Sequence, residues 1–228
     1  MSDKLIRVNV WPAILRLLHL LMASSMLILL LTGGLLQSGM ILNELLYLDL
    51  LEIWHLPAGH VFAAALIVRL VLLFFGKGVL HIRALLDWKL QDVVAVAVFY
   101  ASFARMQLQG YFAHNPLWKS IYLLFFGMSI LQVFSGFLLE SNWLRSVLRT
   151  DSYTVLYYHQ LLFQPLTVIV LAHVLTAILH DWKSDRAEIS AMINGHKFIS
   201  IEPNIGQQEK VESVSVSLAS LTSKDKNQ

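Results

Sequence analysis

The stretch YYHQLLFQPLTVIVLAHVLTAILHDW, residues 157–182, combines a long apolar run with histidines at positions 159, 173 and 180. The run from 156 to 179 contains no Asp, Glu, Lys or Arg, and about 20 such residues are enough for a helix to cross the hydrocarbon core of a bilayer. Ionisable side chains at membrane depth are costly and usually mark a functional site. The stretch therefore predicts a transmembrane helix with functional histidines.

The rest of the chain has the composition of a membrane protein. It is 57% hydrophobic and 14% charged, with a mean hydropathy of +0.62. Three further apolar runs, residues 13–36, 56–75 and 120–139, are long enough to span a bilayer. Because backbone polar groups in lipid must be satisfied internally, uninterrupted runs of this length are helices. We predict an all-α integral membrane protein, a four-helix transmembrane bundle in residues 1–199.

The segments outside these spans predict fewer features. The apolar piece at about 92–105 is too short to cross and predicts an interfacial helix. Residues 200–228 have the composition of a disordered tail. The absence of cysteine excludes covalent c-type haem, iron–sulfur ligation and disulfides. No motif points to a nucleic-acid partner, and the oligomeric state is left open.

Lysines and arginines near the ends of the spans predict the orientation. They gather before the first span, in the loop 76–119 and after the fourth span, whereas the two other loops offer Arg145 and Arg149 beside five acidic residues. Both termini and the loop 76–119 are therefore predicted to face the cytoplasm.

The histidine spacing predicts two sites at different depths. His159 and His173 are fourteen residues apart, which is about four helical turns, so both leave one face of the helix about 21 Å apart. His19 lies at the inner depth and can pair with His173, and His55 at the outer depth can pair with His159. Two imidazoles from facing helices suit the axial positions of b-type haem, whereas zinc would need three or four protein ligands. Two stacked haem b groups are the prediction.

Two other histidines compete for these roles. His60 is five residues from His55, about 140° around the helix, so both cannot face one haem. His180 shares a face with His173 but is assigned to the inner membrane edge. Whether either contacts a haem is left open.

Three glycines would give a flat macrocycle room where helices would otherwise contact it. Gly33, Gly59 and Gly136 all fall at the predicted depth of the outer site. The alternative is that these small residues merely allow the membrane helices to pack closely.

These residues together carry a resemblance to a known family. The pattern consists of Arg16-Leu-Leu-His19, Thr32-Gly33, His55-Leu-Pro-Ala-Gly59 with Arg69, His114-Asn115-Pro116, Ser135-Gly136, His159 fourteen residues before His173-Val174, and Ala191-Met192-Ile193-Asn194-Gly195. It resembles the cytochrome b subunit of membrane-bound nickel-iron hydrogenases. The wider group is the bacterial cytochrome b561 superfamily, which includes the membrane subunit of formate dehydrogenase. The resemblance covers about residues 8–198. One departure from the family's pattern is Gln164-Pro165, which lies between the paired histidines and predicts a kink in the fourth helix.

The resemblance implies a route for electrons across the bacterial inner membrane. A periplasmic oxidoreductase, hydrogenase-like and acting through an iron–sulfur subunit, would deliver electrons to the outer haem. The inner haem would then reduce quinone near the cytoplasmic face, where His114 and Asn115 match the family's quinone position. Asn-Pro is also an ordinary helix-start signal.

Two arginines are candidate partners of the haem propionates, because the guanidinium fork suits carboxylates. Arg16 lies one turn from His19, and Arg69 lies at the inner end of the second span. The alternative is that both lie at the membrane interface with their charges in water.

Three classes of function remain open. The first is an electron-transfer subunit linked to quinone, with the reverse direction, quinol oxidation for a periplasmic reductase, included. The second is a stand-alone cytochrome b561 such as a superoxide:quinone oxidoreductase, which needs a positive outer patch for which Arg145 and Arg149 are available. The third is a transporter or proton path without haem, but the broken helices of paired repeats are missing.

Overall fold

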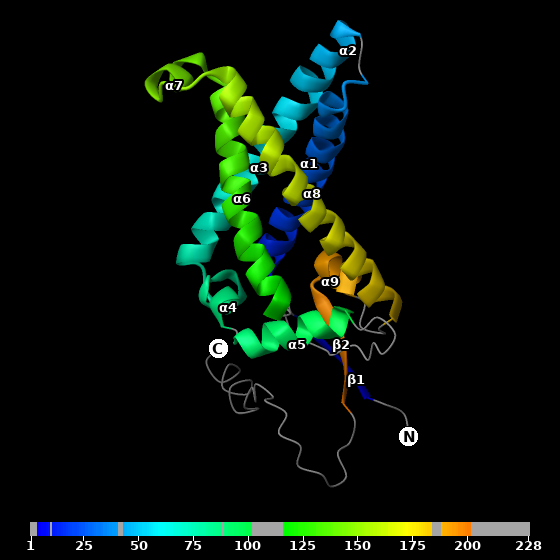
Figure 1. Ribbon diagram of the computed structural model, residues 1–228. Coiled ribbons are helices and arrows are strands. Elements are labelled where there is room, and N and C mark those ends of the chain that lie inside the picture. The colour runs from blue at the N-terminus through cyan, green and yellow to red at the C-terminus, as the bar shows by residue number, and fades with distance from the viewer. Residues whose placement is uncertain are drawn as a thin grey trace, which may run out of the picture. The chain divides into compact units, whose positions relative to one another are not determined.

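The computed structural model describes residues 4–9, 11–40, 43–87, 89–101, 116–183 and 188–201. Residues Arg7–Ile199 form one compact unit, and Figure 1 shows its long helices. The helices are α1 (Ala13–Gln37), α2 (Glu44–Asp49), α3 (Leu56–Phe75), α4 (Arg83–Leu86), α5 (Leu90–Ala101), α6 (Pro116–Glu140), α7 (Asn142–Val147), α8 (Ser152–Lys183) and α9 (Glu188–Asn194). A π-helical segment covers Leu50–His55, a 3₁₀ turn covers Gly78–Leu80, and strands β1 (Lys4–Asn9) and β2 (His196–Ile201) form a two-stranded sheet.

The predicted all-α membrane bundle is confirmed. Within the described residues, four helices are long and apolar enough to cross a membrane, and each contains one of the predicted spans. Large apolar side chains along α8 are exposed on the outside of the unit, among them Leu161, Val168 and Leu171. Such a surface suits contact with lipid rather than water.

The second span begins earlier than the sequence analysis proposed. The helical stretch runs without a break from Glu44 to Phe75, so His55 does not open the helix but lies well inside it. The segment Leu50–His55 is π-helical and joins α2 to α3. Asn43 caps α2 by accepting from the backbone N–H groups of Leu45 and Leu46, which explains why the helix can start at this point.

The bundle is built from two helix pairs. The most extensive packing is between α1 and α3 and between α6 and α8, and smaller contacts join α1 to α8 and α3 to α6. Between the levels of the histidine pairs lies an apolar core formed by Met26, Phe62 and Leu66. Phe125 and Val170 pack against this core, so all four spanning helices contribute to it.

The N-terminus of α1, the loop after α3 and α9 meet at one end of the unit. Trp11, Leu15 and Ala191 form a buried cluster there, and Leu80 and Met192 pack against it. Figure 1 shows α2 and α7 at the opposite end. The three segments predicted to share one side of the membrane therefore lie together.

Three details differ from the sequence analysis or extend it. The sheet was not predicted, because its strands are short and lie far apart in the sequence. Residues 200 and 201, assigned to the tail, belong to β2, and 202–228 lie outside the described residues. A helix, α5 (Leu90–Ala101), lies in the range predicted for an interfacial helix, and the remainder of that range lies outside the described residues.

Candidate functional site

The imidazoles of His55 and His159 face each other at the outer level of the bundle. Their ring centres are 6.4 Å apart and their planes are inclined by 71°. His55 is the last residue of the π-helical segment, and His159 lies two turns into α8. A π-helical turn inside a longer helix is frequently found at a functional site, which agrees with the position of His55.

A second pair lies toward the other end of the same helix α8. His19, from α1, and His173 have ring centres 6.3 Å apart and planes inclined by 66°. The structure thus brings together the two pairs proposed from the fourteen-residue spacing. Each pair takes one histidine from α8 and one from another helix.

The geometry of both pairs suits one metal atom held between two imidazoles. Two metal–nitrogen bonds of about 2 Å each place two imidazole ring centres about 6 Å apart. Within the described ranges, no group of three or more His, Asp or Glu side chains is placed to hold a metal ion. A metal that brings its other ligands with it, as iron does in a porphyrin, fits these donors better than zinc.

Buried hydroxyl groups fix the outer imidazoles. Thr32 Oγ1 lies 2.8 Å from His55 Nδ1, and Ser135 Oγ lies 2.8 Å from His159 Nδ1. Each hydroxyl donates its own hydrogen to a helix carbonyl, Thr32 to Ile28 at 2.7 Å and Ser135 to Gln132 at 2.9 Å. In this arrangement the hydroxyl oxygens accept from Nδ1–H, and each Nε2 then carries the lone pair that a metal ligand needs.

A glycine follows each of these hydroxyl residues and leaves room beside the ring. A Cβ atom at Gly33 would lie 3.5 Å from His55 Cε1 and 3.2 Å from the Phe163 ring, and one at Gly136 would lie 3.5 Å from His159 Cε1. A larger side chain at either position would enter the space between the two imidazoles. The motifs Thr32-Gly33 and Ser135-Gly136 thus serve the two histidines in the same way.

The outer pair borders a cavity of about 310 Å³. All three predicted glycines, Gly33, Gly59 and Gly136, also line this cavity. Most of its wall is apolar, as expected for the binding pocket of a flat hydrophobic group. Two polar atoms at this cavity, Ser129 Oγ and Gln132 Oε1, are buried without a hydrogen-bond partner among the described residues. The side-chain amide nitrogen of Gln132 donates to His159 Nε2 at 3.2 Å, so this nitrogen is an acceptor at the cavity wall and would bind a metal in place of the amide.

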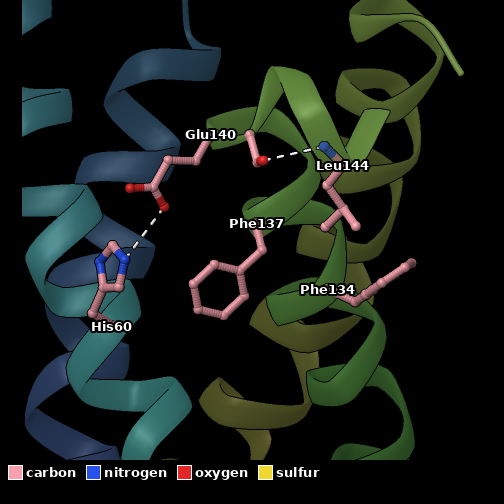
Figure 2. Close-up of a pocket in the computed structure, with 6 residues that line it drawn as sticks. His60, Phe134, Phe137, Glu140 and Leu144 are labelled. Carbon is pink, nitrogen blue, oxygen red and sulfur yellow. Dashed lines mark hydrogen bonds and ion pairs between the residues drawn. The ribbon is translucent and has the colours of Figure 1, made fainter. Parts of the chain in front are cut away.

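His60 lies beside the outer cavity but is not part of the imidazole pair. Its Nε2 is 3.3 Å from Glu140 Oε2, and its Nδ1 is 2.8 Å from the carbonyl oxygen of Leu56. Figure 2 shows the His60 ring and the Glu140 carboxylate pointing toward each other from α3 and α6, with Phe137 close to both. His60 thus shares the wall of the outer cavity with His55, but its ring faces Glu140 and is not part of the imidazole pair.

The inner pair has different surroundings. The ring of Trp118 lies 5.2 Å from that of His173, and the ring of Tyr122 lies 6.0 Å from it. His19 Nδ1 is buried and has no hydrogen-bond partner among the residues that the structure describes. Among the residues that the structure describes, none offers His19 a hydroxyl acceptor corresponding to Thr32 or Ser135.

Arg16 contacts the segment that follows α8. Its guanidinium donates to the carbonyl of Ile193, near the C-terminal end of α9, and its Nε is buried without a partner in the described ranges. Gly195, which has a φ of +85°, lies so close that a Cβ atom there would be 3.2 Å from this guanidinium. Arg16 therefore joins α1 to α9, and its role toward a propionate stays a prediction.

Arg69 is buried, with only 5% of its surface exposed. Its Nη1 donates to the carbonyl of Leu80 at 3.0 Å, and its guanidinium lies 5.6 Å from the centre of the Phe126 ring. Interfacial exposure, the alternative considered from the sequence, does not describe this side chain. A buried guanidinium has further donors available for a carboxylate.

Several predicted features cannot be placed in the site. His114 and Asn115 lie outside the described residues, as does the side chain of His180. Helix α6 begins at Pro116, which agrees with the helix-start signal of Asn-Pro. Pro165 lies inside α8, which continues as one helix from Ser152 to Lys183.

The sequence pattern alone did not predict the roles of Thr32, Ser135, Gln132 and Trp118. Thr32 and Ser135 stood in the recognised motifs, but hydroxyl residues inside a helix commonly bond only their own backbone. A signal was present, because each of the two hydroxyls precedes one of the predicted glycines. Which histidine each would contact depends on how the helices pack.

Comparisons with known proteins identify a matching family and two relatives. The model of a family described as prokaryotic cytochrome b561 matches residues 10–195. Two relatives, from Escherichia coli strain K12 and Escherichia coli O157:H7, are each named probable Ni/Fe-hydrogenase 1 B-type cytochrome subunit. Each is 25% identical over an alignment of 222 residues that covers 86% of this chain and 94% of the relative. No solved structure matches the chain. The family match and the two relatives confirm the resemblance drawn from the motifs.

Proposed function

Because the chain belongs to the prokaryotic cytochrome b561 family, we propose that it carries electrons across the membrane between a periplasmic oxidoreductase and the quinone pool. The family and the four apolar helices make it a multi-pass membrane cytochrome of b type that takes part in electron transfer. The proposal adds two haems, a quinone and a partner. The observation that carries it is that two histidines of α8 each face an imidazole from another helix, at two different levels of the bundle.

The residues around the outer cavity support the first haem site. His55 and His159 would supply the axial nitrogens, with Thr32 and Ser135 holding both rings in the required tautomer. Gly33, Gly59 and Gly136 would leave space for the macrocycle. Haem, when bound, supplies a one-electron carrier that is insulated from water by the apolar wall.

The residues at the other end support the second site. His19 and His173 would supply its axial nitrogens, and the apolar core of Met26, Phe62 and Leu66 excludes water between the two levels. Arg16 and Arg69 are proposed to bind propionates, since each has donors left after its backbone contact. The quinone would bind at this end, with His114 and Asn115 as its proposed partners.

The orientation and the partner rest on charge and on the relatives. The end at which the N-terminus of α1, the loop after α3 and α9 meet carries most of the basic loop residues, so we place it in the cytoplasm. The membrane is then the bacterial inner membrane. The relatives carry the name of a nickel-iron hydrogenase subunit, and we propose a hydrogenase-like periplasmic partner that delivers electrons through an iron–sulfur subunit.

A stand-alone superoxide oxidase is less well supported. Such an enzyme needs a positive surface at its outer end, and Arg145 and Arg149 were the candidates for it; the side chain of Arg149 is exposed. The Arg145 guanidinium instead donates to the carbonyls of Leu138 and Leu139 and to the side chain of Asn142. This arginine is therefore engaged in capping the end of α6.

The full chain, purified gently from membranes of cells that express its partner, is expected to show a b-type reduced-minus-oxidised spectrum. Haem extraction should give two haems per chain, because two imidazole pairs are present. Identification of copurifying proteins should yield a periplasmic oxidoreductase with an iron–sulfur subunit, and addition of its substrate should reduce both haems. A preparation without a b-haem spectrum would refute the haem sites, and haem reduction by superoxide with no partner would favour the stand-alone alternative.

A further inference from the structure

The two imidazole pairs differ in the acceptors available to Nδ1. In the outer pair both rings donate to buried hydroxyls, those of Thr32 and Ser135, which are 6% and 7% exposed. In the inner pair His19 Nδ1 is buried without an acceptor in the described part of the chain, and His173 lies against the rings of Trp118 and Tyr122. The outer pair thus has a hydroxyl acceptor for each Nδ1–H, whereas His19 of the inner pair has none among the described residues.

A hydrogen bond from Nδ1–H increases the electron density of an imidazole and makes it a stronger ligand. A stronger axial ligand stabilises the ferric form of haem iron more than the ferrous form, because the ferric ion carries the higher charge. Hydrogen bonding around the axial ligands is one of the means by which a protein sets a haem potential. The effect is larger where water is absent, and both hydroxyls are buried.

We propose that the Thr32 and Ser135 hydroxyls lower the reduction potential of the outer haem below that of the inner haem. Thr32 and Ser135 are positioning residues, since they act through His55 and His159 rather than on the iron. The inference rests on the proposed function and adds a direction to it. Transfer from the outer to the inner site moves one electron, oxidises the first and reduces the second, makes or breaks no bond, and is downhill.

The hydroxyls are suited to this role because their own hydrogens are already used. Thr32 donates to Ile28 and Ser135 donates to Gln132, both on their own helices. Neither hydroxyl can turn to donate to an imidazole without losing a backbone contact. The direction of both hydrogen bonds, and hence of the expected potential shift, follows from this.

The test is a redox titration of the purified full chain that holds both haems. The wild type is compared with Thr32→Val and Ser135→Ala, which remove one hydroxyl each with little change in shape. The matched controls are Thr167→Val and Ser25→Ala, since these hydroxyls bond helix carbonyls and, within the described ranges, no imidazole. A His173→Ala form, expected to keep only the outer haem, assigns the two potentials.

In the wild type the outer haem is expected to have the lower potential. Each hydroxyl-free variant should raise that potential and reduce the equilibrium constant for outer-to-inner transfer several-fold, and a tenfold change corresponds to about 59 mV for one electron. The inner potential and both controls should not move. Thr32→Ser, which keeps the hydroxyl, should restore the wild-type value.

An outer potential equal to or above the inner one, or an outer potential that does not rise in either variant, would overturn the inference. Loss of the outer haem in both hydroxyl-free variants would also overturn it, because the hydroxyls would then hold the haem rather than set its potential. These results differ from a wild type without b-type haem, which would refute the proposed function instead.

Discussion

Replacing His173 by alanine is expected to remove the inner haem and to leave most of the outer haem in place. His173 faces only His19 among the four paired imidazoles, with ring centres 6.3 Å apart. The outer pair lies at another level of the bundle and makes its own contacts with Thr32 and Ser135. Haem content should therefore fall from two to one per chain, measured by extraction and by the reduced-minus-oxidised spectrum.

The matched control for this substitution is His81→Ala. His81 lies in the segment after α3, where its Nδ1 accepts from the backbone N–H of Arg83 and no second imidazole faces it in the described residues. This variant should keep both haems. Unchanged haem content in the His173→Ala variant, or loss of both haems with a normally folded helical bundle by circular dichroism, would contradict the proposed pairing.

Replacing Gly136 by leucine is expected to have the opposite effect, with loss of the outer haem and retention of the inner one. A Cβ atom at this position would already lie 3.5 Å from His159 Cε1. The rest of a leucine side chain would enter the cavity of about 310 Å³ between His55 and His159. The same spectrum should show one haem, and its potential should match that of the inner site.

Gly127 provides a control in the same helix. A Cβ atom at Gly127 would meet nothing within 4 Å, so Gly127→Leu adds the same side chain to α6 without filling the cavity. Both haems should remain in this variant. If Gly136→Leu also retained both haems, the outer cavity would not be the binding site.

The sequence predicted the spans and the histidine pairs for related reasons. A helix has a fixed rise and a fixed angle per residue, so fourteen residues in one helix determine both the face and the separation of His159 and His173. The length of an apolar run likewise determines whether it can cross a bilayer. Both inferences need only one segment at a time. The spans are confirmed, and the rings lie in the predicted pairs.

The start of the second helix shows where this approach fails. The apolar run that predicted the second span begins at residue 56, directly after His55. The structure extends the helix back to Glu44 and widens it to a π-helix at Leu50–His55. A hydropathy pattern measures burial in lipid, and a helix that extends beyond the hydrocarbon core leaves no such signal.

The sequence by itself determined a four-helix membrane protein with histidines at two depths, because span length, helical periodicity and loop charge are properties of local segments. Only the tertiary structure decided that the Thr32 hydroxyl meets His55 and that the Ser135 hydroxyl meets His159. The tertiary structure also decided that Arg69 is buried and donates to the carbonyl of Leu80. These contacts join residues on different helices or across a loop, and they depend on the rotation and spacing of the helices, which packing sets and no single segment encodes.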